Sequence, residues 1–273
     1  MIEIQPIGTY LTQDENGFIV NDLSINKLDK HWRDVAYYLA KAYKKELGKH
    51  VHSIYIRGSV ARGLVTEISG QAVDGVSDLD SFALVKSSFS EKTIRWQKAD
   101  FQSFIEKELH EKFPFAGDLE MMLATYNRDF KNSRLAMIMK TQSLLVDGEN
   151  IFSELKEYKA NREMCLNYRW LKEDIDAFLK INPQSFTLNQ CSEMMKLIVR
   201  TGFELVIDKV GRFSPDLYIC YRDFSKFYPT KEAEMRQTLH WYLNPILNKK
   251  ELDKFVKNFG LWMERRIKQI KQI

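Results

Sequence analysis

The chain has 273 residues, 44% of them hydrophobic and 29% charged, with only 12 Gly and 6 Pro, so collagen-like, low-complexity and largely disordered classes are excluded. Residues 1–150 carry 19 basic and 21 acidic side chains, whereas residues 151–273 carry 22 and 16. This basic surplus is too small to indicate duplex DNA binding, but it suits a smaller polyanion such as a nucleoside triphosphate.

The chain begins with a helix pattern followed by a strand pattern. Residues 28–47 place apolar side chains three or four positions apart, and Gly48 follows, which predicts a helix that ends there. Residues 52–57 contain alternating isoleucines and lead directly into Gly58-Ser59. We expect a strand that ends in a tight turn and opens a short helix.

The rest of the first half adds strands and one long helix. The glycine-containing stretch 65–77 is predicted to be a loop. An amphipathic helix is predicted at 90–112. Further strands are predicted at 78–86, 118–126 and 143–146, the last of them followed by a turn at 147–148.

Strand patterns disappear after residue 150. Helical periodicity is found instead at 154–180, 187–210, 231–243 and 250–272. We therefore predict an α+β fold with two domains: a small mixed-sheet domain at 1–150 and an all-helical domain at 151–273. Residues 218–228 are rich in aromatic side chains, which either pack in the helical core or stack on a base or a sugar.

Compartment and cysteine state can also be predicted. No apolar run approaches the roughly 18 residues needed to cross a bilayer. The first residues also lack the regions of a signal peptide, so we expect a cytoplasmic protein without membrane contacts. Cys165, Cys191 and Cys220 are odd in number and widely spaced, which favours buried free thiols over disulfides or a zinc site.

Acidic residues on the predicted strands form the first candidate site. Asp78 and Asp80 are two positions apart on one strand, so both side chains project from the same face. Two like charges at this spacing repel unless a cation neutralises them, and carboxylate oxygens are ligands that Mg²⁺ prefers. Glu120 on the next strand can approach them, and Asp118 faces the same way. A bare Asp-x-Asp pair is otherwise an ordinary solvated strand edge.

The Gly58-Ser59 pair favours a metal site over a solvated strand edge. A glycine at the end of a strand lets the backbone approach a bulky anion, and the following N–H groups and the Ser59 hydroxyl can bind phosphate oxygens. Phosphoryl transfer from a nucleotide requires both a phosphate-binding turn and metal-binding carboxylates.

These parts together resemble the DNA polymerase beta-like nucleotidyltransferases. The matching segments are Ile54-Tyr-Ile-Arg-Gly-Ser-Val-Ala-Arg-Gly63, Ser77-Asp-Leu-Asp80 and Leu119-Glu120-Met121. A minimal catalytic domain followed by a helical domain is similar in layout to the aminoglycoside adenylyltransferases and their relatives. One departure is the spacing of 18 residues between Ser59 and Asp78, which is longer than the family's usual loop.

The resemblance implies roles for individual residues. Gly58 and Ser59 would hold the phosphates, with Ser77 also at the nucleotide. Asp78 and Asp80 would bind Mg²⁺, or Mn²⁺ in its place. Glu120 would complete the metal site or act as the general base for the acceptor hydroxyl.

Three cationic residues are weaker candidates for nucleotide binding. Arg62 follows Ser59 closely enough to meet a phosphate, and a solvent-facing arginine is the alternative. Lys196 and Arg200 are four positions apart and share a helix face, where they could contact the triphosphate. A solvated basic face is the ordinary explanation for such a pair.

The predicted function is Mg²⁺-dependent transfer of a nucleoside monophosphate, AMP from ATP, to a hydroxyl of a small molecule such as an aminoglycoside-like compound. Two alternatives remain: a nucleotidyltransferase that acts on a protein or tRNA acceptor, and a catalytically silent nucleotide-binding module. The acceptor and the base preference cannot be derived from one sequence. A homodimer that completes the cleft is also left open.

Overall fold

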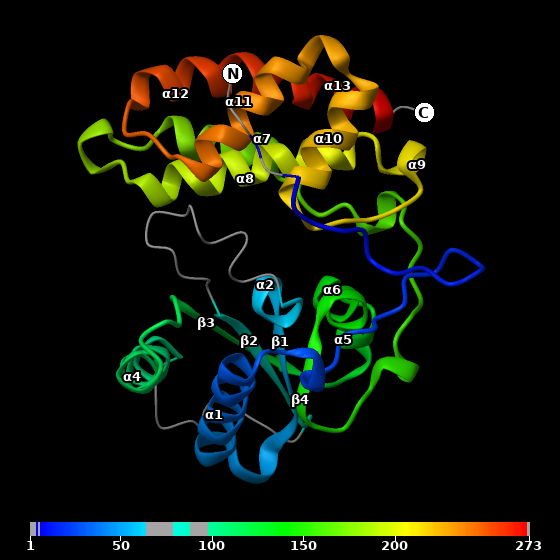
Figure 1. Ribbon diagram of the computed structural model, residues 1–273, viewed down its shortest axis with the longest axis vertical. Coiled ribbons are helices and arrows are strands. Elements are labelled where there is room, and N and C mark those ends of the chain that lie inside the picture. Colours follow the sequence, from blue (N-terminus) through cyan, green and yellow to red (C-terminus); the bar gives the residue numbers. More distant parts are fainter. Residues whose placement is uncertain (1–3, 5, 64–78, 88–97, 272–273) are drawn as a thin grey trace. The chain divides into compact units, whose positions relative to one another are not determined.

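The computed structural model of the chain describes residues 4, 6–63, 79–87 and 98–271 (Figure 1). They fall into two compact units. One contains the sheet and runs from Ile19 to Tyr158, and the other combines the segment up to Phe18 with residues from Lys159 onward. The described residues up to Phe18 therefore belong to the helical unit and not, as the sequence suggested, to the sheet domain. The functional roles assigned to the two domains stay predictions.

The sheet has four strands in the order β3-β2-β1-β4. The strand bounds are β1 Val51–Arg57, β2 Leu79–Val85, β3 Leu119–Thr125 and β4 Leu144–Gly148. Strand β1 pairs antiparallel with both of its neighbours, whereas β2 and β3 are parallel. The predicted mixed sheet is thus confirmed. Strand β4 continues through Gly148, where the sequence predicted a turn.

Helices cover both faces of this sheet (Figure 1). The alternation in β1 explains this, because Ile54 and Ile56 enter one hydrophobic cluster and Tyr55 enters another. The first cluster contains buried side chains of α1 (Lys30–Leu47) and α4 (Lys98–Lys112). The second contains side chains of α5 (Arg128–Lys131) and α6 (Arg134–Gln142). Each face of the sheet is therefore buried beneath helices.

The other unit is helical in its described part. Its helices are α7 Leu171–Leu179, α8 Leu188–Glu204, α9 Ile207–Val210, α10 Leu217–Phe227, α11 Glu232–Leu243, α12 Lys249–Phe255 and α13 Leu261–Lys271, with a π-helical turn at Val256–Gly260 between the last two. Phe224 is fully buried, so this aromatic side chain packs in the core. Cys165, Cys191 and Cys220 are free and buried, as predicted.

The prediction of a helix at 154–180 is wrong over most of this range. Only α7 is an α-helix, and the residues before it form short 3-10 turns at Phe152–Glu154 and Arg162–Met164. At 166–168 the buried carboxylate of Glu204 explains the irregular backbone, because it accepts N–H bonds from Leu166, Asn167 and Tyr168. Those donors are therefore directed at a side chain and not at the carbonyls of a helix.

The N-terminal segment is bound to the helical unit by hydrogen bonds to residues more than 200 positions away. Thr9 donates its N–H to Asp216 Oδ2 at 2.8 Å and accepts from Ser214 Oγ at 2.7 Å. Leu11 N–H bonds the carbonyl of Phe213 at 2.8 Å. In the described part of the chain, no helix combines the length and apolar character that crossing a bilayer requires.

Candidate functional site

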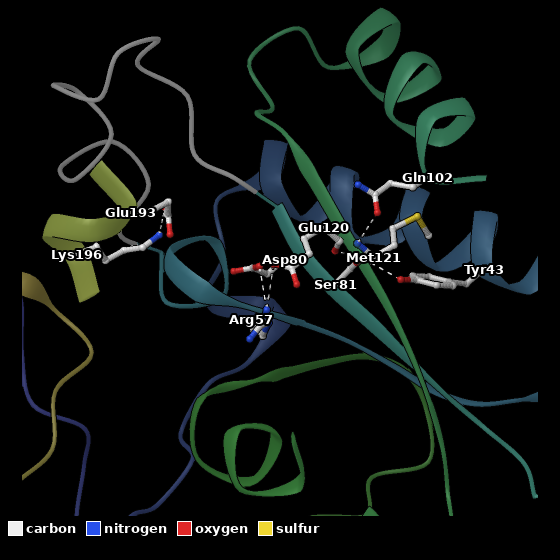
Figure 2. A network of polar contacts seen from close by, with 9 residues as sticks. All are labelled: Tyr43, Arg57, Asp80, Ser81, Gln102, Glu120, Met121, Glu193 and Lys196. Carbon is white, nitrogen blue, oxygen red and sulfur yellow. Dashed lines mark hydrogen bonds and ion pairs between the residues drawn. The ribbon is translucent and has the colours of Figure 1, made fainter. Parts of the chain in front are cut away.

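Three charged side chains lie opposite one another at one end of the sheet. The antiparallel register of β1 and β2 pairs Arg57 with Asp80, and the parallel register of β2 and β3 pairs Asp80 with Glu120. The strand pairing therefore sets this row directly, because residues in register on neighbouring strands project on the same side of a sheet. Figure 2 shows the three side chains converging.

Arg57 is the cation between the two carboxylates. One guanidinium nitrogen, Nη2, lies 3.3 Å from Asp80 Oδ1 and 3.2 Å from Glu120 Oε2. The side chains of Arg57 and Asp80 are 22% and 25% exposed, whereas that of Glu120 is 54% exposed. A substrate approaching from solvent can thus reach Glu120 most easily.

Gly58 provides the space that Asp80 occupies. Its φ of +79° is in the left-handed region that favours glycine. A Cβ at this position would lie 2.7 Å from Asp80 Oδ2. The short helix α2 (Gly58–Ala61) begins at the same residue, so the predicted strand, tight turn and short helix are all found.

A layer of polar contacts behind the site fixes strand β3 (Figure 2). Ser81 is buried, donates to the carbonyl of Glu120 at 3.2 Å and lies 3.1 Å from the Tyr43 hydroxyl. Burial raises the pKa of Tyr43, which therefore stays a neutral partner. From α4, Gln102 and Glu106 accept the N–H groups of Met121 and Leu119 at 3.4 and 2.8 Å. The position of Glu120 is therefore fixed by a hydrogen bond to its own carbonyl and by hydrogen bonds to the N–H groups of Leu119 and Met121.

The structure describes some of the remaining predicted site residues and not others. Ser77 and Asp78 lie outside the described residues, so their place at the site stays a prediction. Arg62 caps the end of α2, and its Nε donates to the carbonyl of Gly58 at 3.3 Å. Asp118 precedes β3, and its carbonyl accepts the Leu79 N–H at 2.8 Å.

The two cations predicted on the second domain lie on α8. Lys196 is ion-paired with Glu193 on the same helix. Arg200 has a buried Nε without a hydrogen-bond partner among the described residues. Both belong to the helical unit, and their contact with a nucleotide stays a prediction.

Sequence reasoning missed Arg57. A signal was available, since this residue directly precedes Gly58 at the end of a predicted strand. An arginine there can reach acidic residues on a neighbouring strand only if that strand pairs in the observed register, which no local pattern reveals.

The donor chemistry of the described site fits a divalent cation. The carboxylates of Asp80 and Glu120 already converge on one positively charged atom, and oxygen ligands suit Mg²⁺ and Mn²⁺. Among the described residues, no group of three or more His, Cys, Asp or Glu side chains is placed to hold a metal ion. A third protein ligand would have to come from elsewhere, and Asp78 is the candidate from sequence.

Comparison with solved structures finds five similar chains. No protein-family model matches the chain, and no curated protein matches it. The chain is similar in structure to spectinomycin adenyltransferase AAD(9) from Enterococcus faecialis, whose crystal structure contains ATP and spectinomycin. The TM-score is 0.47 and the identity 14%, over 86% of this chain and 98% of the other.

Proposed function

We propose that this chain is a Mg²⁺-dependent nucleotidyltransferase that transfers AMP from ATP to a hydroxyl group of a small molecule and releases pyrophosphate. The supporting observation is the approach of the Asp80 and Glu120 carboxylates to a common point beside Gly58. Carboxylates that hold a divalent cation and a glycine turn that admits phosphates are the two parts that such a transfer needs.

The proposed roles follow from position. Asp80 and Glu120 would hold Mg²⁺, with Asp78 as a third ligand. When bound, the ion neutralises charge that develops on the phosphate oxygens during transfer. Glu120 is the most exposed of the described acids at the site, so it is also the candidate to accept the proton of the incoming hydroxyl.

The nucleotide is proposed to bind along the turn. Gly58, Ser59 and Ser77 would contact the phosphates, with Arg62 as an additional cation. Lys196 and Arg200 are also proposed to bind the triphosphate, because the net positive charge of residues 151–273 favours a polyanion. A small-molecule acceptor is favoured over nucleic acid because the basic surplus of the chain is small.

The test is a thermal-shift panel of the four nucleoside triphosphates with and without Mg²⁺. A ligand that binds the folded state raises the melting temperature by mass action. We expect ATP with Mg²⁺ to stabilise the wild type and to leave Asp80→Asn unchanged. Asp129→Asn removes the same charge from an exposed position on α5 and should keep the wild-type response. Equal responses of the wild type and Asp80→Asn would contradict the proposal.

A catalytically silent nucleotide-binding module is the second candidate. The observation that favours it is Arg57, whose guanidinium lies between the carboxylates that would hold the metal. A silent module should bind a triphosphate equally well with and without Mg²⁺. It should also release no pyrophosphate in the presence of any hydroxyl acceptor, whereas the enzyme should release it together with an adenylylated product.

A further inference from the structure

Arg57 is bound to the site by more than an ordinary surface ion pair. A single nitrogen, Nη2, contacts carboxylates from two different strands. Arg57 is in register with Asp80 on β2, and Asp80 is in register with Glu120 on β3. The Nε of the same side chain is buried and has no hydrogen-bond partner among the described residues. The guanidinium therefore keeps its position through Asp80 and Glu120, and it retains a donor that these carboxylates do not satisfy.

This position is the one that a divalent cation would need. Asp80 and Glu120 repel one another, and the guanidinium of Arg57 reduces this repulsion by pairing with both. The two carboxylates that accept from Arg57 are also the described carboxylates that could bind a metal ion. Guanidinium and metal therefore compete for the same pair of carboxylates.

We propose that Arg57 is a resident counter-ion that makes metal binding depend on the triphosphate. This inference rests on the proposed nucleotidyltransferase function. The metal displaces the guanidinium from Asp80 and Glu120, and the guanidinium then contacts phosphate oxygens beside Gly58, the next residue in the chain. Without a triphosphate the displaced arginine loses both of its described carboxylate partners, so metal binding alone is disfavoured.

The thermodynamic consequence is reciprocal. If the triphosphate strengthens metal binding by some factor, the metal must strengthen triphosphate binding by the same factor. Removal of the Arg57 charge should tighten binding of the metal alone, because two carboxylates are left without a counter-ion. The same change should weaken the dependence of metal binding on the triphosphate.

The experiment is a titration with Mn²⁺, followed by electron paramagnetic resonance, with and without a non-hydrolysable ATP analogue. The proteins are the wild type, Arg57→Gln, Arg57→Lys, Asp80→Asn and Arg128→Gln. We expect Arg57→Gln to bind Mn²⁺ alone about tenfold more tightly than the wild type, since a charge-assisted contact is worth about one decade or more in affinity. Arg57→Lys keeps the charge and should fall between them. Arg128→Gln removes an exposed charge on α5 and should match the wild type.

The effect of the analogue provides the second readout. It should tighten Mn²⁺ binding strongly in the wild type and about tenfold less in Arg57→Gln. Circular dichroism checks that each variant is folded. If Arg57→Gln does not fold, Arg57→Lys still tests the inference. Arg57 variants that bind Mn²⁺ with wild-type affinity and wild-type dependence on the analogue overturn the inference, while loss of binding in Asp80→Asn still supports the proposed function. Absence of Asp80-dependent Mn²⁺ binding in every protein overturns both.

Discussion

The site depends on the residues at the end of β1, where a glycine follows an arginine. Gly58 allows the turn because its φ is +79°, and its missing side chain leaves room for the Asp80 carboxylate. Gly63, five residues later, has a similar φ of +69°, but a Cβ there would have no atom of the described residues within 4 Å. Substitutions at both glycines should change stability through the backbone conformation, but only a substitution at Gly58 should also move the Asp80 carboxylate.

Gly58→Ala and Gly63→Ala should each lower the free energy of unfolding by about 1 kcal/mol, because both place a Cβ in the left-handed region. Only Gly58→Ala should also remove the Mg²⁺-dependent thermal shift with ATP, since its methyl group displaces Asp80 Oδ2. Urea denaturation measures the first effect and the thermal-shift assay the second. A full nucleotide response in Gly58→Ala would show that the carboxylate can move without loss of binding.

At the scale of elements, buried and half-buried carboxylates connect helices to their surroundings. Glu204 at the end of α8 accepts N–H bonds from three consecutive residues of the segment before α7, and the side chain of Asn167 adds a fourth donor at 2.7 Å. On α11, Glu232 accepts from Arg236 Nε at 2.8 Å and from the Tyr221 hydroxyl of α10. Each carboxylate thus links two segments that the chain separates.

Glu204→Ala should lower the free energy of unfolding by about 2–4 kcal/mol, because it leaves several partly buried N–H donors without an acceptor. Glu193→Ala, at an exposed position on the same helix, should cost less than about 1 kcal/mol. Urea denaturation of both variants tests this. Similar losses in the two variants would contradict the structural role of Glu204.

The contribution of Glu232 should depend on pH. Its hydrogen bond from Arg236 holds its pKa below the ordinary value of 4.5, and burial raises the pKa of Tyr221 to about 12, so the tyrosine remains a donor at neutral pH. A carboxyl group with a lowered folded-state pKa stabilises the fold above its unfolded pKa, and this stabilisation is lost as pH falls through the folded value.

Glu232→Gln should therefore lower stability by about 0.3–1 kcal/mol at pH 7, and the difference from the wild type should disappear below the folded-state pKa. Denaturation at a series of pH values from 7 to 3 measures it. A difference that stays constant over this range would show that the charge of Glu232 contributes nothing.

For the whole molecule, the N-terminal segment completes the helical unit. Tyr10 donates its hydroxyl to Asp223 Oδ2 at 2.5 Å and accepts from Arg222 Nη2 at 2.6 Å. The guanidinium of Arg212 lies 4.1 Å from the centre of the same ring. This unit thus combines the described residues before Ile19 with those from Lys159 onward.

Tyr10→Phe should keep the ring and its cationic neighbour but remove the hydroxyl from the Asp223–Arg222 contact. We expect a loss of about 1–2 kcal/mol in the free energy of unfolding and faster proteolysis near the N-terminus. Tyr37→Phe, at a side chain that is 45% exposed on α1, should change neither. Unchanged proteolysis of Tyr10→Phe would contradict the anchoring role of the hydroxyl.

Local patterns predicted much of the sheet unit and part of the site. Apolar alternation indicated the strands, and Gly58 and the carboxylate at position 80 were identified from their neighbours along the chain. The same reasoning failed at 154–180, where helical periodicity was present but Glu204, on a distant helix, binds the backbone donors. A hydrophobic pattern does not reveal a buried acceptor supplied from another element.

The sequence by itself determined the α+β class, the strand that leads into Gly58, and the candidate acids Asp80 and Glu120, because these features follow from residues close together in the chain. Only the tertiary structure decided the strand order and register, and with them the position of Arg57 between the two acids. It also decided the attachment of the N-terminal segment to residues around 213–223. Contacts between distant segments depend on which surfaces pack together, and no local pattern contains that information.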